Sequence, residues 1–276
     1  MKYYFFLGGH DLEMLEIRKI ILNQGYKENI SVFDLHLRWG ARLSSYSKII
    51  QKIEKNEKLN VAYLTTKFFS NLYGDEKAKN AYSIVGIELI NDFSCLNYIE
   101  IDHHNENSYK PSSMEQVAGL LNVELNRYQL LVAANDKAYI PAMMEMGATS
   151  EEIETIRLAD RAAQGVTQED EMLARKSIAT GYKIINGIKV VKSLGNKFSP
   201  ITDRLFPYEK LLVYNEKELN YYGQGKEKLI LEFEPLLLEN KAYHGGGENG
   251  FFGISPGIFL PVEIEQFVEK TIKLVS

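Results

Sequence analysis

The sequence predicts an α/β protein with an N-terminal doubly wound, mostly parallel sheet and a smaller C-terminal α/β domain. In the first half, short apolar runs alternate with segments of helical spacing, an alternation typical of a parallel sheet. Acids and histidines follow several predicted strands, where open α/β sheets bind ligands. From Ile188 onward the segments are short and β-rich. We therefore expect domains at 1–165 and 187–276, joined by a helical connector at 166–186.

The first predicted elements form a strand, a turn and a helix. The apolar run Tyr3–Leu7 ends at Gly8-Gly9, which predicts a buried strand and a tight turn. Apolar residues then recur at roughly helical spacing from Leu12 to Leu22, and Gly25 is the expected C-cap. The alternation continues with a strand at Ile30–Phe33, a helix at Ser44–Lys55 and a strand at Val61–Leu64.

The middle of the chain combines another strand with several helices. Tyr98–Ile101 alternates with period two, which predicts a strand. Ser113-Met-Glu-Gln116 matches a capping box and predicts a helix to about Tyr128, followed by a strand at Leu130–Ala134 that ends at Asn135-Asp136. Two more helices are expected, from the capping pattern Thr149–Glu152 to before Gly165, and from Gln168 to Thr180.

The C-terminal part predicts three strands and a closing helix. The strand-like runs are Ile188–Val191, Lys210–Tyr214 and Leu229–Phe233, with turn-like residues between them. The closing helix begins at about Val262.

Composition limits the classes of function. The chain has 276 residues and a net charge of -5, which argues against broad, non-specific binding to nucleic acid. Its single cysteine, Cys95, excludes an internal disulfide framework. The N-terminus stops being apolar too soon for a signal peptide or a spanning helix, so we expect a cytoplasmic protein with no membrane partner.

The segment Asp102-His103-His104 is the most informative chemical feature. It follows the predicted strand Tyr98–Ile101 and so is expected at the ligand-binding edge of the sheet. Carboxylate oxygens and neutral imidazole nitrogens are ligands for Mn²⁺, Zn²⁺ or Fe²⁺. This segment therefore predicts metal binding.

Acids recur after other predicted strands. Asp11 and Glu13 follow the first one, with His10 beside them, and Asp136 follows a later one. Three acids with one or two histidines can hold two divalent ions about 3.5 to 4 Å apart, an arrangement that serves phosphoryl hydrolysis. The alternative is that Asp11 and Glu13 simply favour a helix N-terminus and that His10 caps a turn. His36 has no supporting neighbours, so we expect a structural role for it.

The run His244-Gly-Gly-Gly247 is the second unusual segment. Adjacent glycines cost backbone entropy, and one reason to have them is the close approach of backbone N–H groups to an anion. A flexible hairpin is the alternative. The pairs Asp160-Arg161 and Asp203-Arg204 are interpreted as surface ion pairs.

Taken together, these motifs resemble the DHH phosphoesterase superfamily with a DHHA1-type C-terminal domain. The resemblance spans nearly the whole chain, through His10-Asp-Leu-Glu13, Asp102-His103-His104 with Asn105, Asp136 and Gly245-Gly-Gly247. It implies two manganese ions held by metal ligands among Asp11, Glu13, Asp102, His103 and Asp136, with His10 as a further candidate. It also implies catalytic roles for Asp102, His103 and His104. Substrate binding would then involve His104, Asn105, His244, Gly245, Gly246 and Gly247.

Three positions differ from the family pattern. Glu13 stands where the family usually has aspartate, and Glu248 stands where histidine usually follows the glycines. The family's intermediate aspartate has no clear equivalent, and Asp34 and Asp92 are the candidate substitutes.

The function implied is a metal-dependent phosphoesterase. Its substrate would be a phosphodiester or phosphomonoester of a short oligonucleotide, a cyclic dinucleotide or a nucleotide-like molecule. Partners are then a phosphate-containing small molecule or a short single-stranded nucleic acid, and a homodimer is an option. The alternative is a catalytically degenerate relative that acts as a ligand-binding or protein-interaction module. An inorganic pyrophosphatase is disfavoured because the basic C-terminal motif of those relatives is absent from this sequence.

Overall fold

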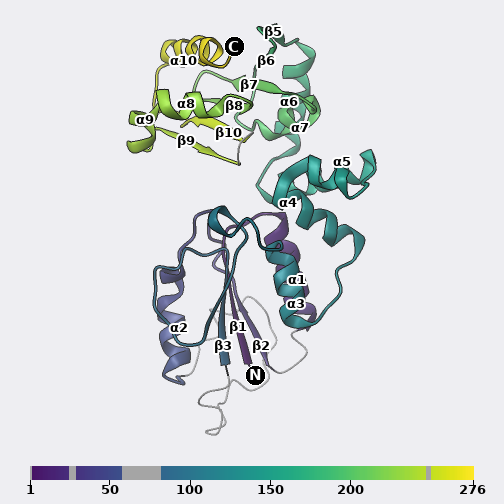
Figure 1. Cartoon of the computed structure of the whole chain (residues 1–276), viewed down its shortest axis with the longest axis vertical. Coiled ribbons are helices and arrows are strands. Elements are labelled where there is room, and N and C mark those ends of the chain that lie inside the picture. The colour runs from purple at the N-terminus through teal and green to yellow at the C-terminus, as the bar shows by residue number, and fades with distance from the viewer. Residues whose placement is uncertain (1, 25–28, 58–81, 247–249) are drawn as a thin grey trace. The chain divides into compact units, whose positions relative to one another are not determined.

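The chain forms two compact α/β units, Met1–Gln164 and Gly165–Ser276, in a computed structural model that describes residues 2–24, 29–57, 82–246 and 250–276 (Figure 1). The predicted α/β class is confirmed. The expected C-cap Gly25, the strand Val61–Leu64 and residues Gly247 and Glu248 lie outside the described residues.

The first unit is built on a parallel four-stranded sheet in the order β2-β1-β3-β4. Three of its strands confirm the sequence predictions, and one, β3, was not predicted. The strands are β1 (Lys2–Leu7), β2 (Ile30–Phe33), β3 (Tyr82–Ile87) and β4 (Tyr98–Ile101). Because β2 and β3 lie on opposite sides of β1, the strand order reverses between β1 and β3, and this is a topological switch point.

Helices cover both faces of this sheet (Figure 1). On one face, a 3₁₀ turn η1 (Leu43–Tyr46) continues into α2 (Ser47–Glu54), which packs its isoleucines against Phe6 and Phe33. The rings of Phe6 and Phe33 stack with centroids 4.9 Å apart. On the other face, α1 (Leu12–Gln24) and α3 (Ser113–Leu121) contact each other. The sheet is therefore doubly wound, as the alternation in the sequence predicts.

Two predictions in the middle of the chain are wrong. The capping box is formed by Ser112 and Glu115, one residue earlier than expected, and α3 ends at Leu121, where Asn122 adopts a left-handed conformation. The run Leu130–Ala134 is not a strand but lies in α4 (Arg127–Glu145), which begins with a second capping box at Asn126. A short apolar run fits a buried strand or a buried helix equally well, and here the capping box at Asn126 starts a helix that includes the run.

Helix α4 is broken within its length. Ala138 and Tyr139 have non-helical backbone angles, and Tyr139 has a φ of 62°. Pro141 follows the break, and it cannot donate a backbone hydrogen bond within the helix. The next helix, α5 (Ser150–Ala163), begins at the predicted capping box of Thr149 and Glu152 and completes the first unit.

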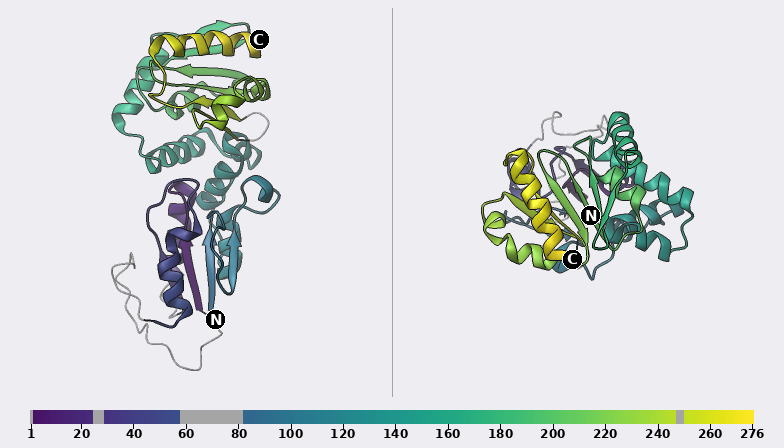
Figure 2. Two further views of the ribbon diagram at one scale, coloured as in Figure 1. Left: turned by 90° about the vertical axis from the view of Figure 1, so that its left-hand side faces the viewer. Right: turned by 90° about the horizontal axis from the view of Figure 1, so that it is seen from above.

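The second unit contains a mixed six-stranded sheet in the order β5-β6-β7-β8-β10-β9. Figure 2 shows the C-terminal helix α10 (Pro261–Val275) lying along one face of this sheet, where Ile264 and Val268 are buried. The strands are β5 (Lys183–Ile185), β6 (Ile188–Lys192), β7 (Lys210–Tyr214), β8 (Leu219–Gly223), β9 (Ala242–Gly245) and β10 (Phe251–Ile254).

The helices of this unit include one correction. The predicted strand Leu229–Phe233 lies mostly in α8 (Lys226–Glu232), because Leu229 and Phe233, four residues apart, turn the same face into the core. The predicted helix at 168–180 is α6 (Gln168–Ala179), which contacts α7 (Ser199–Leu205), and α9 (Glu234–Leu238) follows α8. No helix among the described residues is both long enough and apolar enough to cross a bilayer.

Candidate metal centre at the switch point

Four carboxylates and two imidazoles gather near the carboxyl ends of β1, β3 and β4. They are Asp11, Glu13, Glu88, His103, His104 and Asp136, and we call them the candidate metal centre. One ligand atom from each of Glu88, His103, His104 and Asp136 lies within 4.8 Å of the others. Loops at this edge of a parallel sheet are where α/β proteins bind ligands, and the centre lies at the switch point.

Glu88 is the acid that sequence reasoning missed. It directly follows β3, has a φ of 51°, and its side chain is only 7% exposed. Its carbonyl lies so close to Gly8 that a side chain there would collide with it, at 2.3 Å from an added Cβ. The signal was present in the sequence as the apolar run Tyr82–Ile87 followed by an acid. The candidate substitutes Asp34 and Asp92 bond elsewhere, to His36 and Arg18 and to Ser44 and Arg42, respectively.

His103 lies at the middle of the centre and is buried. Its Nε2 lies 2.9 Å from Asp136 Oδ2, and its Nδ1 lies 3.8 Å from Glu88 Oε1 and 4.0 Å from Glu13 Oε2. The backbone N–H of Ser113, at the start of α3, donates to Nδ1 over 3.1 Å and fixes the ring. His103, the second residue of the Asp-His-His segment, is thus the residue that Glu13, Glu88 and Asp136 all approach.

Three acids of the centre, Asp11, Glu13 and Glu88, have pKa values above their usual range. Burial, followed by the negative charges of Asp136 and Glu88, raises the pKa of Asp11 to about 8 and raises that of Glu13 well above its ordinary value. Burial and the charge of Asp136 also raise the pKa of Glu88. Buried carboxylates that repel one another in this way favour a proton or a cation between them.

Both acids of the first motif also contribute to helix termini. Asp11 Oδ1 accepts the backbone N–H of Met14 over 2.8 Å and caps α1, as the alternative interpretation proposed. Glu13 Oε1 accepts the N–H of Met114 in α3 over 3.0 Å. Each carboxylate has a second oxygen, and that of Glu13 is buried without a hydrogen-bond partner. Glu13, although longer than the usual aspartate, therefore brings a carboxylate to the centre.

Asp102 pairs with His104 and is not among the grouped ligand atoms. Its Oδ1 accepts the backbone N–H of His104 over 2.9 Å and lies 3.0 Å from His104 Nδ1. The hydrogen bond that the His104 ring donates to Asp102 raises the pKa of His104 to about 9. Burial acts to raise the pKa of Asp102, but the hydrogen bonds from His104 outweigh it and lower that pKa to about 2. His104 Nε2 is left facing Asp136 Oδ2 at 3.9 Å.

The unpartnered atoms fit a divalent cation. Seven buried side-chain nitrogen and oxygen atoms in the described residues lack a hydrogen-bond partner, and four belong to the centre: Glu13 Oε2, Glu88 Oε1, His103 Nε2 and Asp136 Oδ2. His103 Nε2 and Asp136 Oδ2 are 2.9 Å apart and still make no hydrogen bond. Buried polar atoms without partners are costly. Carboxylate oxygens and imidazole nitrogens are ligands that Mn²⁺ accepts, so a cation among Glu88, His103 and Asp136 would supply the missing partners there.

Asp136 reaches the centre from a helix and not from a strand end. It lies in α4 two residues before the break at Ala138, so the expectation that three strand ends align Asp11, Asp102 and Asp136 is wrong for Asp136. The strand-end acids are Asp11, Asp102 and the missed Glu88. The helix placement is possible because α4 contacts both α1 and α3.

A buried polar network adjoins Asp136. Arg157 Nη1 donates to Asn135 Oδ1 over 2.9 Å and to Asp160 Oδ2 over 2.7 Å, and its guanidinium lies over the ring of Tyr139 at 4.5 Å. Asp160 and Arg161 are 6% and 4% exposed, so their interpretation as a surface pair is wrong. The negative charge of Asp160 contributes to the raised pKa of Asp11, which places this network beside the centre.

His10 and Asn105 are exposed and lie outside the group of ligand atoms. The ring of His10 contacts the ring of His36, with centroids 5.5 Å apart. Asn105 has a φ of 50° and begins a 3₁₀ turn.

The glycine run lies in the second unit, at the hairpin of β9 and β10. Gly246 has a φ of 72°, and a side chain at Gly250 would meet the carbonyl oxygen of Gly245 at 1.9 Å. The geometry of the hairpin thus explains glycine at 246 and 250. Lys226 Nζ donates to the carbonyl of Gly245 over 3.0 Å, and His244 is exposed. These observations fit both the hairpin and the anion-binding interpretation.

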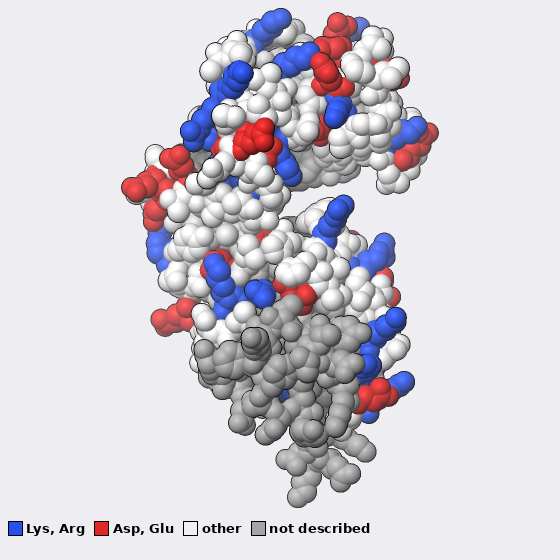
Figure 3. Space-filling view, turned by 180° about the vertical axis from the view of Figure 1, so that it is seen from behind, with Lys and Arg blue, Asp and Glu red and all other residues white. Residues whose placement is uncertain are grey.

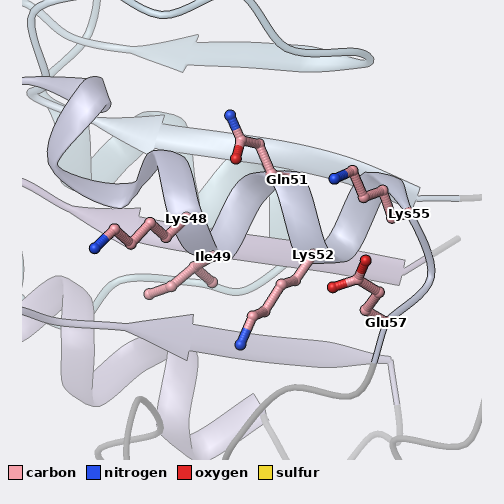
Figure 4. A pocket seen from close by; sticks show the side chains of 6 residues that line it. All are labelled: Lys48, Ile49, Gln51, Lys52, Lys55 and Glu57. Carbon is pink, nitrogen blue, oxygen red and sulfur yellow. The ribbon is translucent and has the colours of Figure 1, made fainter.

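A separate surface pocket of about 210 Å³ lies over α2 (Figure 4). It is lined by Lys48, Ile49, Gln51, Lys52, Lys55 and Glu57. None of these residues belongs to the candidate metal centre.

The fold and site define a two-unit α/β protein with a carboxylate–imidazole centre at the switch point of its parallel sheet. The chain is similar to several solved structures, one of which is described as a DHH domain. One is a pGpG-specific phosphodiesterase from Vibrio cholerae, with 11% identity, a TM-score of 0.46 and full coverage of both chains. Another is the DHH domain of a member of a family of ribosomal proteins, with 11% identity, a TM-score of 0.41, and coverage of 100% of this chain and 88% of that one.

A third is RecJ in complex with Mn²⁺ from Thermus thermophilus, with 10% identity and a TM-score of 0.44. The match covers 99% of this chain and 52% of that one. No protein-family model and no curated protein matches the chain. At such low identity the likeness concerns the fold, so conclusions about chemistry come from the site itself.

Proposed function

We propose that this protein is a metal-dependent phosphoesterase that acts on a short oligonucleotide, a cyclic dinucleotide or a nucleotide-like phosphate. The observation that carries the proposal is the convergence of Glu88, His103 and Asp136, with Glu13 Oε2 4.0 Å from His103 Nδ1, and each of these four residues has a buried atom that lacks a partner. Four carboxylates in one place repel an anionic substrate unless cations are present, so the site requires metal before it can accept a phosphate.

The metal is proposed to be manganese, held by Asp11, Glu13, Glu88, His103 and Asp136. When bound, one or two such ions activate water and neutralise charge on a phosphoryl group. Similar solved structures include a RecJ described in complex with Mn²⁺. The resemblance placed Asp102 and His10 among the ligands as well. We propose instead that Asp102 orients His104 and that His10 does not bind the metal.

The protein's own residues supply orientation and a proton donor. Asp102 holds the Nδ1 side of His104 and favours its protonated form, which leaves Nε2 directed toward Asp136. A protonated imidazole in this position can donate to a phosphoryl or leaving oxygen. In the second unit, His244 and Gly245–Gly247 remain the proposed phosphate-binding segment.

A short substrate suits the charge of the surface. On the face shown in Figure 3, lysine and arginine are interspersed with aspartate and glutamate over the described residues, and no broad basic field is visible there. Binding of long nucleic acid depends on neutralising many phosphates at once. Together with the net charge of -5, this surface favours a substrate with few phosphates.

The test combines metal content with hydrolysis. The purified chain is expected to bind at least one Mn²⁺ and to hydrolyse bis-p-nitrophenyl phosphate only with added metal. His103→Ala should abolish turnover and keep the circular dichroism spectrum of the folded protein. Metal binding without hydrolysis of this compound or of dinucleotides would favour the degenerate, ligand-binding alternative. Less than one metal per chain together with no hydrolysis would refute the proposal.

A further inference from the structure

A loop at the edge of the candidate metal centre displays an exposed aromatic side chain. It comprises residues 35–42, between β2 and η1, and we call it the Trp39 loop. Trp39 is 77% exposed and Leu35 is 40% exposed. Tryptophan is enriched at binding surfaces, because its ring offers a large, rigid contact area.

The Trp39 loop is joined to the segments that directly follow β1 and β3. Leu37 forms a parallel bridge with Gly9, two residues before Asp11. Arg42 forms a second bridge with Ile90, two residues after Glu88. Trp39 lies between these two anchors, and an added side chain at Gly9 would come within 3.0 Å of its Cα. The loop therefore passes beside the switch point, between the segment after β1 and the segment after β3.

The start of the loop is held by buried polar groups. The hydroxyl of Tyr46, which is fully buried, donates to the carbonyl of Leu7 over 2.7 Å and accepts the N–H of Leu35 over 3.2 Å. The buried carboxylate of Asp34 accepts the N–H of His36 over 2.8 Å. These bonds order the backbone in advance, which lowers the entropy cost of binding a ligand there.

The neighbours of Trp39 suit a phosphorylated ligand. The exposed rings of His10 and His36 contact each other, with centroids 5.5 Å apart, and His10 directly precedes Asp11. Arg38, next to Trp39, is also exposed. Imidazole and guanidinium groups donate hydrogen bonds to phosphate and ribose oxygens, whereas an indole offers a flat face for a base.

We infer that the Trp39 loop is a nucleoside-binding platform, on which the indole of Trp39 stacks on a base while His10 and His36 contact the adjoining phosphate or ribose. This inference rests on the proposed function, because it names the substrate as a nucleotide whose scissile phosphate lies at the candidate metal centre. It also gives a role to the two histidines that the centre does not use.

Trp39 is the only tryptophan in the sequence, so the fluorescence of the protein reports on it alone. The full chain, at a fixed saturating concentration of Mn²⁺, is titrated with guanosine 5′-monophosphate, adenosine 5′-monophosphate and ribose 5-phosphate, with free N-acetyltryptophanamide in the same buffer as the correction for absorbance. Saturable quenching by both nucleotides but not by ribose 5-phosphate is expected. This readout needs no hydrolysis.

The kinetic arm uses a 5′-phosphorylated dinucleotide as substrate. Trp39→Ala should raise KM about 5- to 100-fold with little change in kcat, as expected for the loss of base stacking, and Trp39→Phe should restore most of the affinity. The matched control is Leu96→Ala, which removes an exposed apolar side chain just before β4, at the opposite edge of the same sheet. Its KM should equal that of the natural chain.

The outcomes separate the two proposals. Saturable quenching without hydrolysis of any phosphoester would support the platform and refute the proposed function. Hydrolysis of the dinucleotide with no quenching and an unchanged KM in Trp39→Ala would overturn the platform alone. A fluorescence change that follows protein concentration and is removed by dilution, with no response to nucleotides, would assign Trp39 to contact between two copies of the chain and would also overturn it.

Discussion

The guanidinium Nη1 of Arg157 lies 2.9 Å from Oδ1 of Asn135, the residue immediately before Asp136. This bond ties α5 to the segment of α4 that delivers Asp136 to the candidate metal centre. The same guanidinium bonds Asp160 and lies over Tyr139, whose backbone angles break α4. Arg157 is thus placed to stabilise the break in α4 at Ala138 and Tyr139, and through it the orientation of Asp136.

Replacing Arg157 with Met should destabilise the protein and weaken metal binding. The change leaves the buried groups of Asn135 and Asp160 without this donor, and removing one partner of a buried ion pair costs about 3 kcal/mol or more. Urea unfolding measures the loss of stability, and Mn²⁺ titration measures the affinity. Arg157→Lys keeps the charge but not the planar guanidinium. Its stability and its Mn²⁺ affinity should therefore lie between those of the natural chain and those of the Met variant. Unchanged Mn²⁺ affinity in a folded Met variant would show that the network does not position Asp136.

Glu88→Gln should reduce metal binding and activity while stabilising the metal-free protein. It removes one of several buried charges that repel one another, yet it also removes a proposed ligand. Turnover should fall at least about 100-fold, since even indirect partners of a metal commonly contribute 10- to 100-fold. The control is Asp92→Asn, an equivalent change in an acid that also follows β3 but bonds Ser44 and Arg42. Equal effects of the two variants would remove Glu88 from the site.

The stability of the metal-free protein should decrease as the pH rises. In the folded state the pKa of Asp11 is raised to about 8, and those of Glu13 and Glu88 are also raised. The folded protein therefore keeps protons that the unfolded chain has already released, so this contribution is complete below the ordinary carboxylate pKa and is lost as the pH rises through about 8. Thermal melts with a chelator, at about pH 5.5 and about pH 8.5, measure the effect.

Added Mn²⁺ should reverse that trend. A cation replaces the protons between the carboxylates, so the gain in melting temperature from Mn²⁺ should be larger at the higher pH. His103→Ala provides the comparison, because it should lose most of the gain. A chelated protein that is more stable at the higher pH would contradict the raised pKa values.

Asp102→Asn should lower the pKa of His104 from about 9 toward its ordinary value. The hydrogen bond that His104 donates to Asp102 is the largest contribution to that shift, and asparagine carries no charge to favour the imidazolium. Turnover should fall about 10- to 100-fold, as for the loss of an orienting partner. NMR titration of the His104 ring protons in the metal-free protein measures the pKa. A ring that still titrates near pH 9 would exclude Asp102 as the cause.

Much of the fold follows from local patterns. The compact apolar run of β1, the helical spacing of α1 and the period-two alternation of β4 each specify an element without reference to the rest of the chain. The errors occurred where two patterns compete. Leu130–Ala134 and Leu229–Phe233 are short apolar runs that fit either a strand or a helix, and a cap or a shared buried face decided in favour of the helix.

The sequence by itself determined the α/β class and the chemical identity of most of the centre, because Asp11, Glu13, Asp102-His103-His104 and Asp136 stand out by type and local setting. Only the tertiary structure decided which of them converge. It brought Glu88, which the sequence had not singled out, into the centre, paired Asp102 with His104, and placed Asp136 there from a helix. The physical reason is that residue type fixes what a side chain can bind, whereas strand order and helix packing fix which side chains meet, and these depend on contacts far apart in the chain.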